Sequence, residues 1–317
     1  MISLRLSKSR QAGLTMVELM VALGISMLIT LAAIAALVVA RRGFDTVDSA
    51  SQMRDNMRFT SDLIQRLGAQ TGYKDVQYFG AAPISASIGG HNNALLDSIG
   101  APTTISVKAG QGINGSDILI LRSHGSADGS VIHCSGGAVS ASTSPDDWSV
   151  NVLHVALSNG ELSLMCSQFK TVGFSLPVPS EPIIQGVENF QVLYGVDNVT
   201  PNTAPAGNTD SVPDRFLRAD QMVVAGNPDS ADTQANWRRV RSLRIGMVLR
   251  GPLNSQQEKV AQTFYPFGMA KASAGGAEGG ALSSTNDAGT KMVVSTPDGR
   301  LRQTVTFTVH LRNDQTL

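Results

Sequence analysis

The chain has 317 residues, of which 42% are hydrophobic and 16% are charged, and it is long enough to bury the core of one or two globular units. Its 25 basic residues balance its 25 acidic residues, so the total charge argues against nucleic acid as a main partner. The 31 glycines predict many turns and long loops.

The N-terminal segment predicts a membrane anchor. Residues 1–13 are basic and contain no acidic residue, and residues 19–40 are uncharged. A helix over residues 19–40 spans about 33 Å, which is enough to cross the hydrocarbon layer. The basic start favours a cytoplasmic N-terminus, although Arg41 and Arg42 beyond the apolar stretch reduce that charge difference. On this orientation the rest of the chain lies outside the cytoplasm.

An ordinary secretory signal is the alternative interpretation of this segment. Such a signal has an apolar region of about 7–15 residues and is cut beyond it. The apolar region here is longer, and Glu18 lies almost at its cytoplasmic edge, where an unpaired carboxylate is costly. A new α-amino group and a buried glutamate of neighbouring subunits can neutralise one another and set their register. A single-pass anchor whose Glu18 merely faces the headgroups is the less favoured alternative.

The sequence around Glu18 carries a family resemblance. Residues 13–23, GLTMVELMVAL, resemble the class III signal of type IV pilins and type II secretion pseudopilins. The resemblance implies that a prepilin peptidase cuts between Gly13 and Leu14 and methylates the amine of Leu14, with Glu18 as the fifth mature residue. Leu14 stands where major pilins usually carry Phe, and Ala35 where many carry a helix-kinking Pro. Both departures favour a minor component over the bulk subunit.

Helical spacing continues beyond the membrane segment. The apolar positions at steps of three, four or seven are Phe44, Val47, Ala50, Met53, Met57, Ile64 and Leu67. Gly68 and Gly72 predict the end of the helix. We therefore expect a stem helix over residues 14–67, on the order of 80 Å long, whose second half packs one apolar stripe on a domain.

After Tyr73 the pattern changes to the period of two that is typical of strands. The expected strands lie at 118–121, 150–157, 161–169, 190–194, 243–249 and 301–311, and Ser158-Asn159-Gly160 predicts a hairpin between two of them. One covered sheet face and the amphipathic helix together predict an α+β head over residues 73–317, with an antiparallel sheet. The expected loops are 80–115, 136–147, 198–214, 226–236 and 270–299, and Ala270–Thr285 is expected to be poorly ordered.

Cys134 and Cys166 are the only cysteines. In an exported domain an isolated pair favours a disulfide, which would stabilise the fold by roughly 3–4 kcal/mol through closure of the intervening loop. A metal site formed by both cysteines with His124 and His133 is the alternative, but the chain lacks paired ligand spacing. We expect no metal and no cofactor.

The sequence contains no recognisable catalytic motif, and we expect no enzymatic activity and no small-molecule substrate. Four residues of one polar loop are Ca²⁺-ligand types, Asp197, Asn198, Asp210 and Asp214, but their spacing favours solvated turns. The densest basic cluster consists of Arg238, Arg239, Arg241 and Arg244, beside Trp237. A strand edge or a subunit contact is favoured there over nucleic acid.

The C-terminal residues Asp298-Gly299-Arg300-Leu301-Arg302 and Leu311-Arg312-Asn313, with the spacing of the strands, resemble the PilW group of type IV pilus assembly proteins. The resemblance implies a minor pilin that helps to initiate a pilus, with other minor pilins and the major pilin as partners. It implies an inner-membrane protein with a periplasmic head that later reaches the pilus or cell surface. A J-type pseudopilin of the type II secretion system, a pilus-tip adhesin and a tethered periplasmic enzyme are the alternatives.

Overall fold

The computed structural model describes residues 13, 15–78, 85–256, 258–268 and 290–313. The chain divides into two compact units, residues 1–48 and residues 49–317, and each is described by itself.

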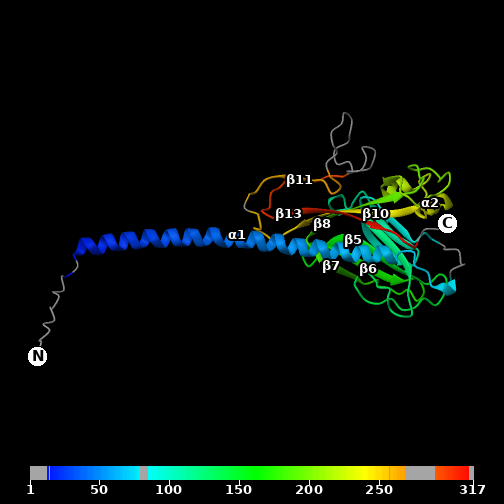
Figure 1. Ribbon diagram of the computed structural model, residues 1–317, viewed down its shortest axis with the longest axis horizontal. Helices are drawn as coiled ribbons and strands as arrows, with labels where there is room; N and C mark the ends of the chain where they lie inside the picture. Colours follow the sequence, from blue (N-terminus) through cyan, green and yellow to red (C-terminus); the bar gives the residue numbers. More distant parts are fainter. Residues whose placement is uncertain (1–12, 14, 79–84, 257, 269–289, 314–317) are drawn as a thin grey trace, which may run out of the picture. The chain divides into compact units, whose positions relative to one another are not determined.

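One long helix, α1 (Met16–Gln70), begins in the first unit and ends in the second (Figure 1). Its bounds agree with the predicted stem to within three residues. The apolar stripe differs from the prediction, because Phe44 and Val47 are exposed and the buried face includes Met53, Ile64 and Leu67. Within the second unit, the part of α1 from Ser49 onward buries one face in the head.

The end of α1 is set by Gly72 and not by Gly68. Gly72 has a φ of 77°, the left-handed conformation that ends many helices. Gly68 lies inside the helix, where an added Cβ would stand 2.3 Å from a methyl carbon of Val309. The prediction that Gly68 marks the stop was wrong, since this glycine permits close packing of the helix on the C-terminal strand.

A five-stranded antiparallel sheet forms one half of the head, in the order β1-β4-β5-β6-β7. Its strands are β1 (Ile88–His91), β4 (Ile118–His124), β5 (Trp148–Ser158), β6 (Glu161–Lys170) and β7 (Ser180–Gln185). Strands β5 and β6 join through Asn159 and Gly160, both at positive φ, as a two-residue type I′ hairpin requires. The hairpin predicted from Ser158-Asn159-Gly160 is confirmed.

A four-stranded antiparallel sheet in the order β13-β10-β8-β9 forms the other half. Its strands are β8 (Val187–Val196), β9 (Arg215–Leu217), β10 (Val240–Arg250) and β13 (Arg302–His310), and Figure 1 shows β8, β10 and β13 side by side. Two separate two-stranded antiparallel sheets pair β2 (Ala94–Ala101) with β3 (Thr104–Ala109) and β11 (Gln262–Phe264) with β12 (Met292–Val294). The remaining elements are the helix α2 (Ala231–Trp237) and 3-10 turns at Val76–Tyr78, Ile113–Gly115 and Ala219–Met222. The α+β class is confirmed.

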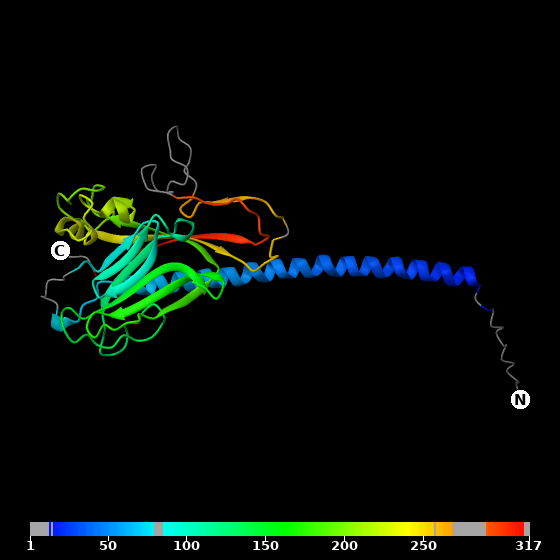
Figure 2. The same cartoon turned by 180° about the vertical axis from the view of Figure 1, so that it is seen from behind.

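The two larger clusters of the core lie on opposite faces of the five-stranded sheet, and a third, small cluster contains Leu193 and Phe267. Leu119 and Leu121 of β4 point into the larger cluster, which both sheets and α1 share. Ile118 and Ile120 point to the opposite face, where the β2–β3 hairpin covers them; Figure 2 shows this cyan hairpin beside the green strands. The prediction of a single covered face was wrong. Burial on both faces explains the unbroken Ile-Leu-Ile-Leu run of β4.

Three predicted loops contain regular structure. Residues 80–115 include β1, β2 and β3, residues 226–236 include most of α2, and residues 270–299 include β12. The missed strands are rich in Gly, Ser, Thr and Ala, and their side chains are mostly half-exposed, so an apolar alternation is weak in them. Ala270–Thr285 lies outside the described residues.

Candidate functional site

The N-terminus of α1 is closed by a reciprocal capping box. The Glu18 carboxylate accepts hydrogen bonds from the backbone N–H of Thr15 at 3.2 Å and from its hydroxyl at 3.1 Å. The Thr15 hydroxyl in turn accepts from the backbone N–H of Glu18 at 3.3 Å. This arrangement satisfies donors that a helix start leaves unpaired and places a negative charge at its positive end.

The capping box holds the carboxylate close to the predicted cleavage site. Gly13 is exposed, and Leu14 lies outside the described residues. Glu18 is exposed within its own chain and retains acceptor capacity beyond the two bonds from Thr15. Thr15 was missed by the sequence analysis, although the spacing Thr15-x-x-Glu18 before an apolar run is a capping-box signal.

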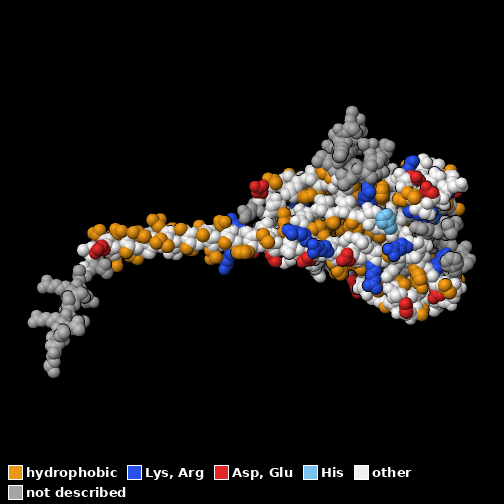
Figure 3. Space-filling model, viewed as in Figure 1, with side chains coloured by type: hydrophobic (Ala, Val, Ile, Leu, Met, Phe, Trp, Pro, Cys, Tyr) orange, Lys and Arg blue, Asp and Glu red, His pale blue; other side chains and the backbone are white. Residues whose placement is uncertain are grey.

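The first unit presents its apolar side chains outward. From Met16 to Val39 the large hydrophobic side chains of α1 are between 41% and 76% exposed, and Figure 3 shows them in orange along the helix. Among the described residues, α1 is the one helix whose length and composition suffice to cross a membrane. Such a surface requires lipid or other apolar helices around it.

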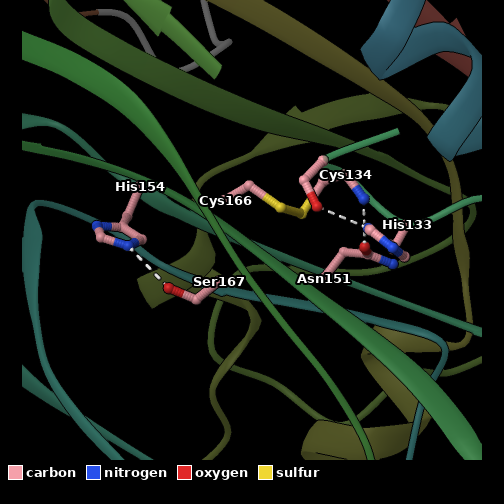
Figure 4. The surroundings of a disulfide bond; sticks show 7 residues. His133, Cys134, Asn151, His154, Cys166 and Ser167 are labelled. Carbon is pink, nitrogen blue, oxygen red and sulfur yellow. Dashed lines mark hydrogen bonds between the residues drawn. A yellow bond between two sulfur atoms is a disulfide. The ribbon is translucent and has the colours of Figure 1, made fainter. Parts of the chain in front are cut away.

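In the head, Cys134 and Cys166 are joined in a disulfide, as predicted (Figure 4). Cys166 lies on β6 in the larger core cluster, and Cys134 belongs to the long connection between β4 and β5. The backbone N–H of Cys134 donates to the side-chain oxygen of Asn151 on β5 at 2.7 Å. Both bonds attach the connection to the middle of the sheet.

The metal site considered for this region is excluded by these contacts. The two sulfurs bond each other, so neither is a thiolate ligand. His124 is buried, accepts at Nδ1 from the backbone N–H of Asp75 and donates from Nε2 to the carbonyl of Pro145. Burial is the main cause that lowers the pKa of His124 and keeps its ring neutral. His133 bonds the Ser135 hydroxyl at 2.8 Å.

The arginine cluster at the start of β10 binds the protein's own chain. Arg239 donates to the carbonyls of Asn198, Ala206 and Gly207 at 3.0–3.2 Å. Buried Arg241 pairs with Asp197 at 3.5 Å. The guanidinium of Arg244 lies 4.0 Å from the centre of the Phe216 ring. Arg239 thus holds loop 198–214, and Arg241 and Arg244 contact residues that flank this loop, which the sequence analysis did not foresee.

The carboxylates of the polar loop accept hydrogen bonds from backbone groups of the loop itself. Asp197 accepts from the backbone N–H of Ser211 at 2.8 Å, and Asp214 accepts from that of Asn198 at 2.7 Å. No group of three or more His, Cys, Asp or Glu residues with metal-binding geometry occurs among the described residues. The carboxylates serve as acceptors for turn N–H groups, in agreement with the turn interpretation.

The motif around Asp298 builds an ion-pair network between the two sheets. Its members are Glu161, Glu188, Arg250, Asp298, Arg300 and Arg302. Arg302 joins Glu188 at 2.5 Å and Asp298 at 2.7 Å, and both Arg302 and Glu188 are almost fully buried. Glu161, at the β5–β6 hairpin, accepts from Arg250 at 2.6 Å and from Arg300 at 3.1 Å. Three positive and three negative charges therefore balance at this junction.

Comparison with known proteins gives two family matches and a structural similarity. The profile of the type IV pilus-assembly protein W family matches residues 154–313, about half of the chain, which includes the whole ion-pair network. The chain belongs to this family. The profile of the prokaryotic N-terminal methylation motif matches residues 8–34.

The type IV-like pilin TTHA1219 from Thermus thermophilus is similar in structure over 82% of this chain and 97% of its own. The identity is 14% and the TM-score is 0.38. The fold is therefore assigned from the helix and strands of this chain and not from this similarity. No curated protein sequence matches significantly.

The family match and the methylation motif are consistent with the need of α1 for apolar surroundings. The type IV pilus-assembly protein W family is a family of structural assembly proteins. In this PilW-family chain, the N-terminal apolar helix with its methylation motif is the anchor in the inner membrane.

Proposed function

We propose that this PilW-family protein is a minor pilin that helps to initiate assembly of a type IV pilus. A prepilin peptidase cuts between Gly13 and Leu14 and methylates Leu14. The stem helix, residues 14–67, then enters the filament with its apolar surface against other stems, and the head, residues 73–317, lies outside the cytoplasm. The observation that carries the proposal is the exposed apolar helix with Glu18 held at its start, in a chain of this family.

In this proposal Glu18 neutralises the methylated amine of a neighbouring subunit. A carboxylate at the edge of the apolar layer is costly unless it is paired. The capping box already gives Glu18 two hydrogen bonds and fixes the direction of its side chain. A neighbouring amine would supply the missing positive charge, so pairing favours one register between stems.

Initiation is tested by co-purification of the full chain, in detergent, with the other minor pilins and the major pilin of its source. The chain is expected to form a small complex with other minor pilins before the major pilin joins. A chain found only as isolated molecules, with pilus formation unchanged after its deletion, would contradict the proposal.

A J-type pseudopilin of the type II secretion system and a tip adhesin are the second candidates. The pseudopilin shares the N-terminal signal, so the deletion phenotype separates the two systems: loss of twitching supports the pilus, and loss of enzyme secretion supports the secretion system. An adhesin requires a ligand-binding site on the head.

A further inference from the structure

A partly buried arginine without a carboxylate partner lines a cavity in the head. Arg122 on β4 donates to the carbonyl of Ala86 at 3.0 Å, which is the one hydrogen bond that its side chain makes to described residues. Among the described residues no ion pair joins Arg122 to a carboxylate. Burial alone lowers the pKa of Arg122 to about 10, with no acidic group opposing that effect.

Three other buried or largely buried arginines of the head each pair with a carboxylate. Arg241 pairs with Asp197, Arg250 with Glu188, and Arg302 with Glu188 and Asp298. Removing a guanidinium from water is costly unless an anion compensates its charge. Arg122 therefore stands out as a largely buried cation that forms no ion pair within the described part of the chain.

The cavity beside Arg122 has a volume of about 210 Å³. Hydroxyl groups of Ser85 and Thr103 line it and are able to donate to an oxyanion, whereas the Thr171 hydroxyl, also in the lining, donates to the carbonyl of Asp146. Apolar surface comes from Pro102, Trp148 and Val172. The volume is below the roughly 300–1,000 Å³ of pockets for drug-sized ligands, so a small molecule or the end of a chain fits it.

Charge decides which oxyanion suits the cavity. Asp146 also lines it, and a second negative charge on the ligand would meet that carboxylate. One guanidinium matches one carboxylate in a two-pronged geometry. The apolar wall at Trp148 and Val172 then suits a short hydrocarbon substituent.

We propose that the cavity beside Arg122 binds a monocarboxylate that carries a small apolar group, with Arg122 as the anion-binding residue. The ligand is either a free organic acid or the C-terminal carboxylate of a peptide with an apolar last residue. The site is separate from the stem and does not depend on the assembly role of the protein.

The experiment is a titration of the full chain in detergent with isovalerate, followed by tryptophan fluorescence. Trp148 and Trp237 are the two tryptophans, and Trp148 lines the cavity. A saturable change is expected with isovalerate, and none with isovaleramide or with sodium chloride at the same ionic strength. Trp148→Phe is expected to remove the signal. Saturation by a tripeptide ending in leucine, but not by its amidated form, would identify a chain end as a ligand; saturation by isovalerate alone would identify the free acid.

Two variants locate the site. Arg122→Gln is expected to weaken isovalerate binding by about tenfold or more, since a charge-assisted hydrogen bond is lost. Val172→Glu places a carboxylate at an exposed position of the cavity wall and is expected to abolish binding even if Arg122→Gln fails to fold. Arg312→Gln, at an exposed arginine, is the control and retains binding. Equal binding of isovaleramide, tighter binding of inorganic phosphate, or unchanged binding by both site variants would overturn the proposal.

Discussion

At the residue scale, glycine and buried carboxylate positions decide how the head packs. Gly68 matters because it has no side chain: the helix α1 approaches β13 so closely that a single methyl group overlaps Val309. Asp117 matters because its carboxylate lies between elements and accepts from the backbone N–H groups of Asn93 and Val192, each at 2.8 Å. Both residues join segments far apart in the sequence.

Replacement of Gly68 by alanine tests the first contact. Gly68→Ala is expected to destabilise the head by about 1–3 kcal/mol, because the helix or the strand must move to admit the methyl group. The measurement is the free energy of unfolding by denaturant. Gly43→Ala is the control, since no atom lies within 4 Å of an added Cβ there. Equal stabilities of the two variants would show that α1 packs less tightly on β13.

Replacement of Asp117 by asparagine tests the role of the buried carboxylate. Burial is the largest cause that raises the pKa of Asp117 to about 7, from 3.8. The folded protein thus binds more protons than the unfolded chain between these values. The contribution of Asp117 to stability is present below the unfolded pKa and is lost as pH rises toward about 7, by up to about 1.4 kcal/mol per pH unit.

The free energy of unfolding of the wild type minus that of Asp117→Asn is therefore expected to fall as pH rises from about 4 to about 7. Denaturant unfolding at several pH values gives this difference, and other titrating groups cancel in it. A difference that stays level, or one that rises with pH, would refute the raised pKa.

At the scale of elements, the two sheets are joined by charges as well as by the shared core. Buried Glu188 on β8 accepts from Arg250 on β10 and from Arg302 on β13, and Glu161 of the other sheet joins the same network. The hydrogen bond with Arg302 is the main cause that lowers the pKa of Asp298 to about 2. A balanced network of this kind specifies which strand ends meet.

Arg302→Met tests this network. The expected loss is about 3–5 kcal/mol of unfolding free energy, since removal of one partner leaves a buried charge uncompensated. Arg312→Met, at an exposed position beyond the end of β13, is expected to change it by less than about 0.5 kcal/mol. The double variant Glu188→Met with Arg302→Met is expected to lose less than the two single losses combined. Additive losses would mean that the two residues do not interact.

At the scale of the whole molecule, one helix serves two environments. Its first part exposes apolar side chains, and its part from Ser49 onward buries one face in the head. In the proposed assembly role, the charge that pairs with a neighbouring subunit is the Glu18 carboxylate, which accepts a hydrogen bond from the Thr15 hydroxyl.

Glu18→Ala is expected to leave membrane insertion and cleavage intact and to reduce incorporation into the pilus by roughly tenfold, because the neighbouring amine loses its counter-charge. Thr15→Val keeps the carboxylate but removes a hydrogen bond to it, so its defect is expected to be smaller. Immunoblots of sheared pili against membrane fractions measure both. Normal incorporation of Glu18→Ala would refute the pairing.

The sequence by itself determined the anchor, the long helix, the family and the principal strands. These depend on local patterns: an uncharged stretch of membrane length, a methylation motif, and period-two alternation in β5, β6, β8, β10 and β13. The pairing of Cys134 with Cys166 followed from their number and expected compartment.

Only the tertiary structure decided which faces are covered and which charges meet. Strands β2 and β3 have little apolar alternation, because they form a half-exposed layer over a second sheet face. Arg239 binds loop 198–214 and Arg241 pairs with Asp197, while Arg122 lines a cavity and forms no ion pair among the described residues. The physical reason is that local patterns arise from neighbours in the chain, whereas burial and ion pairing depend on residues far away in sequence.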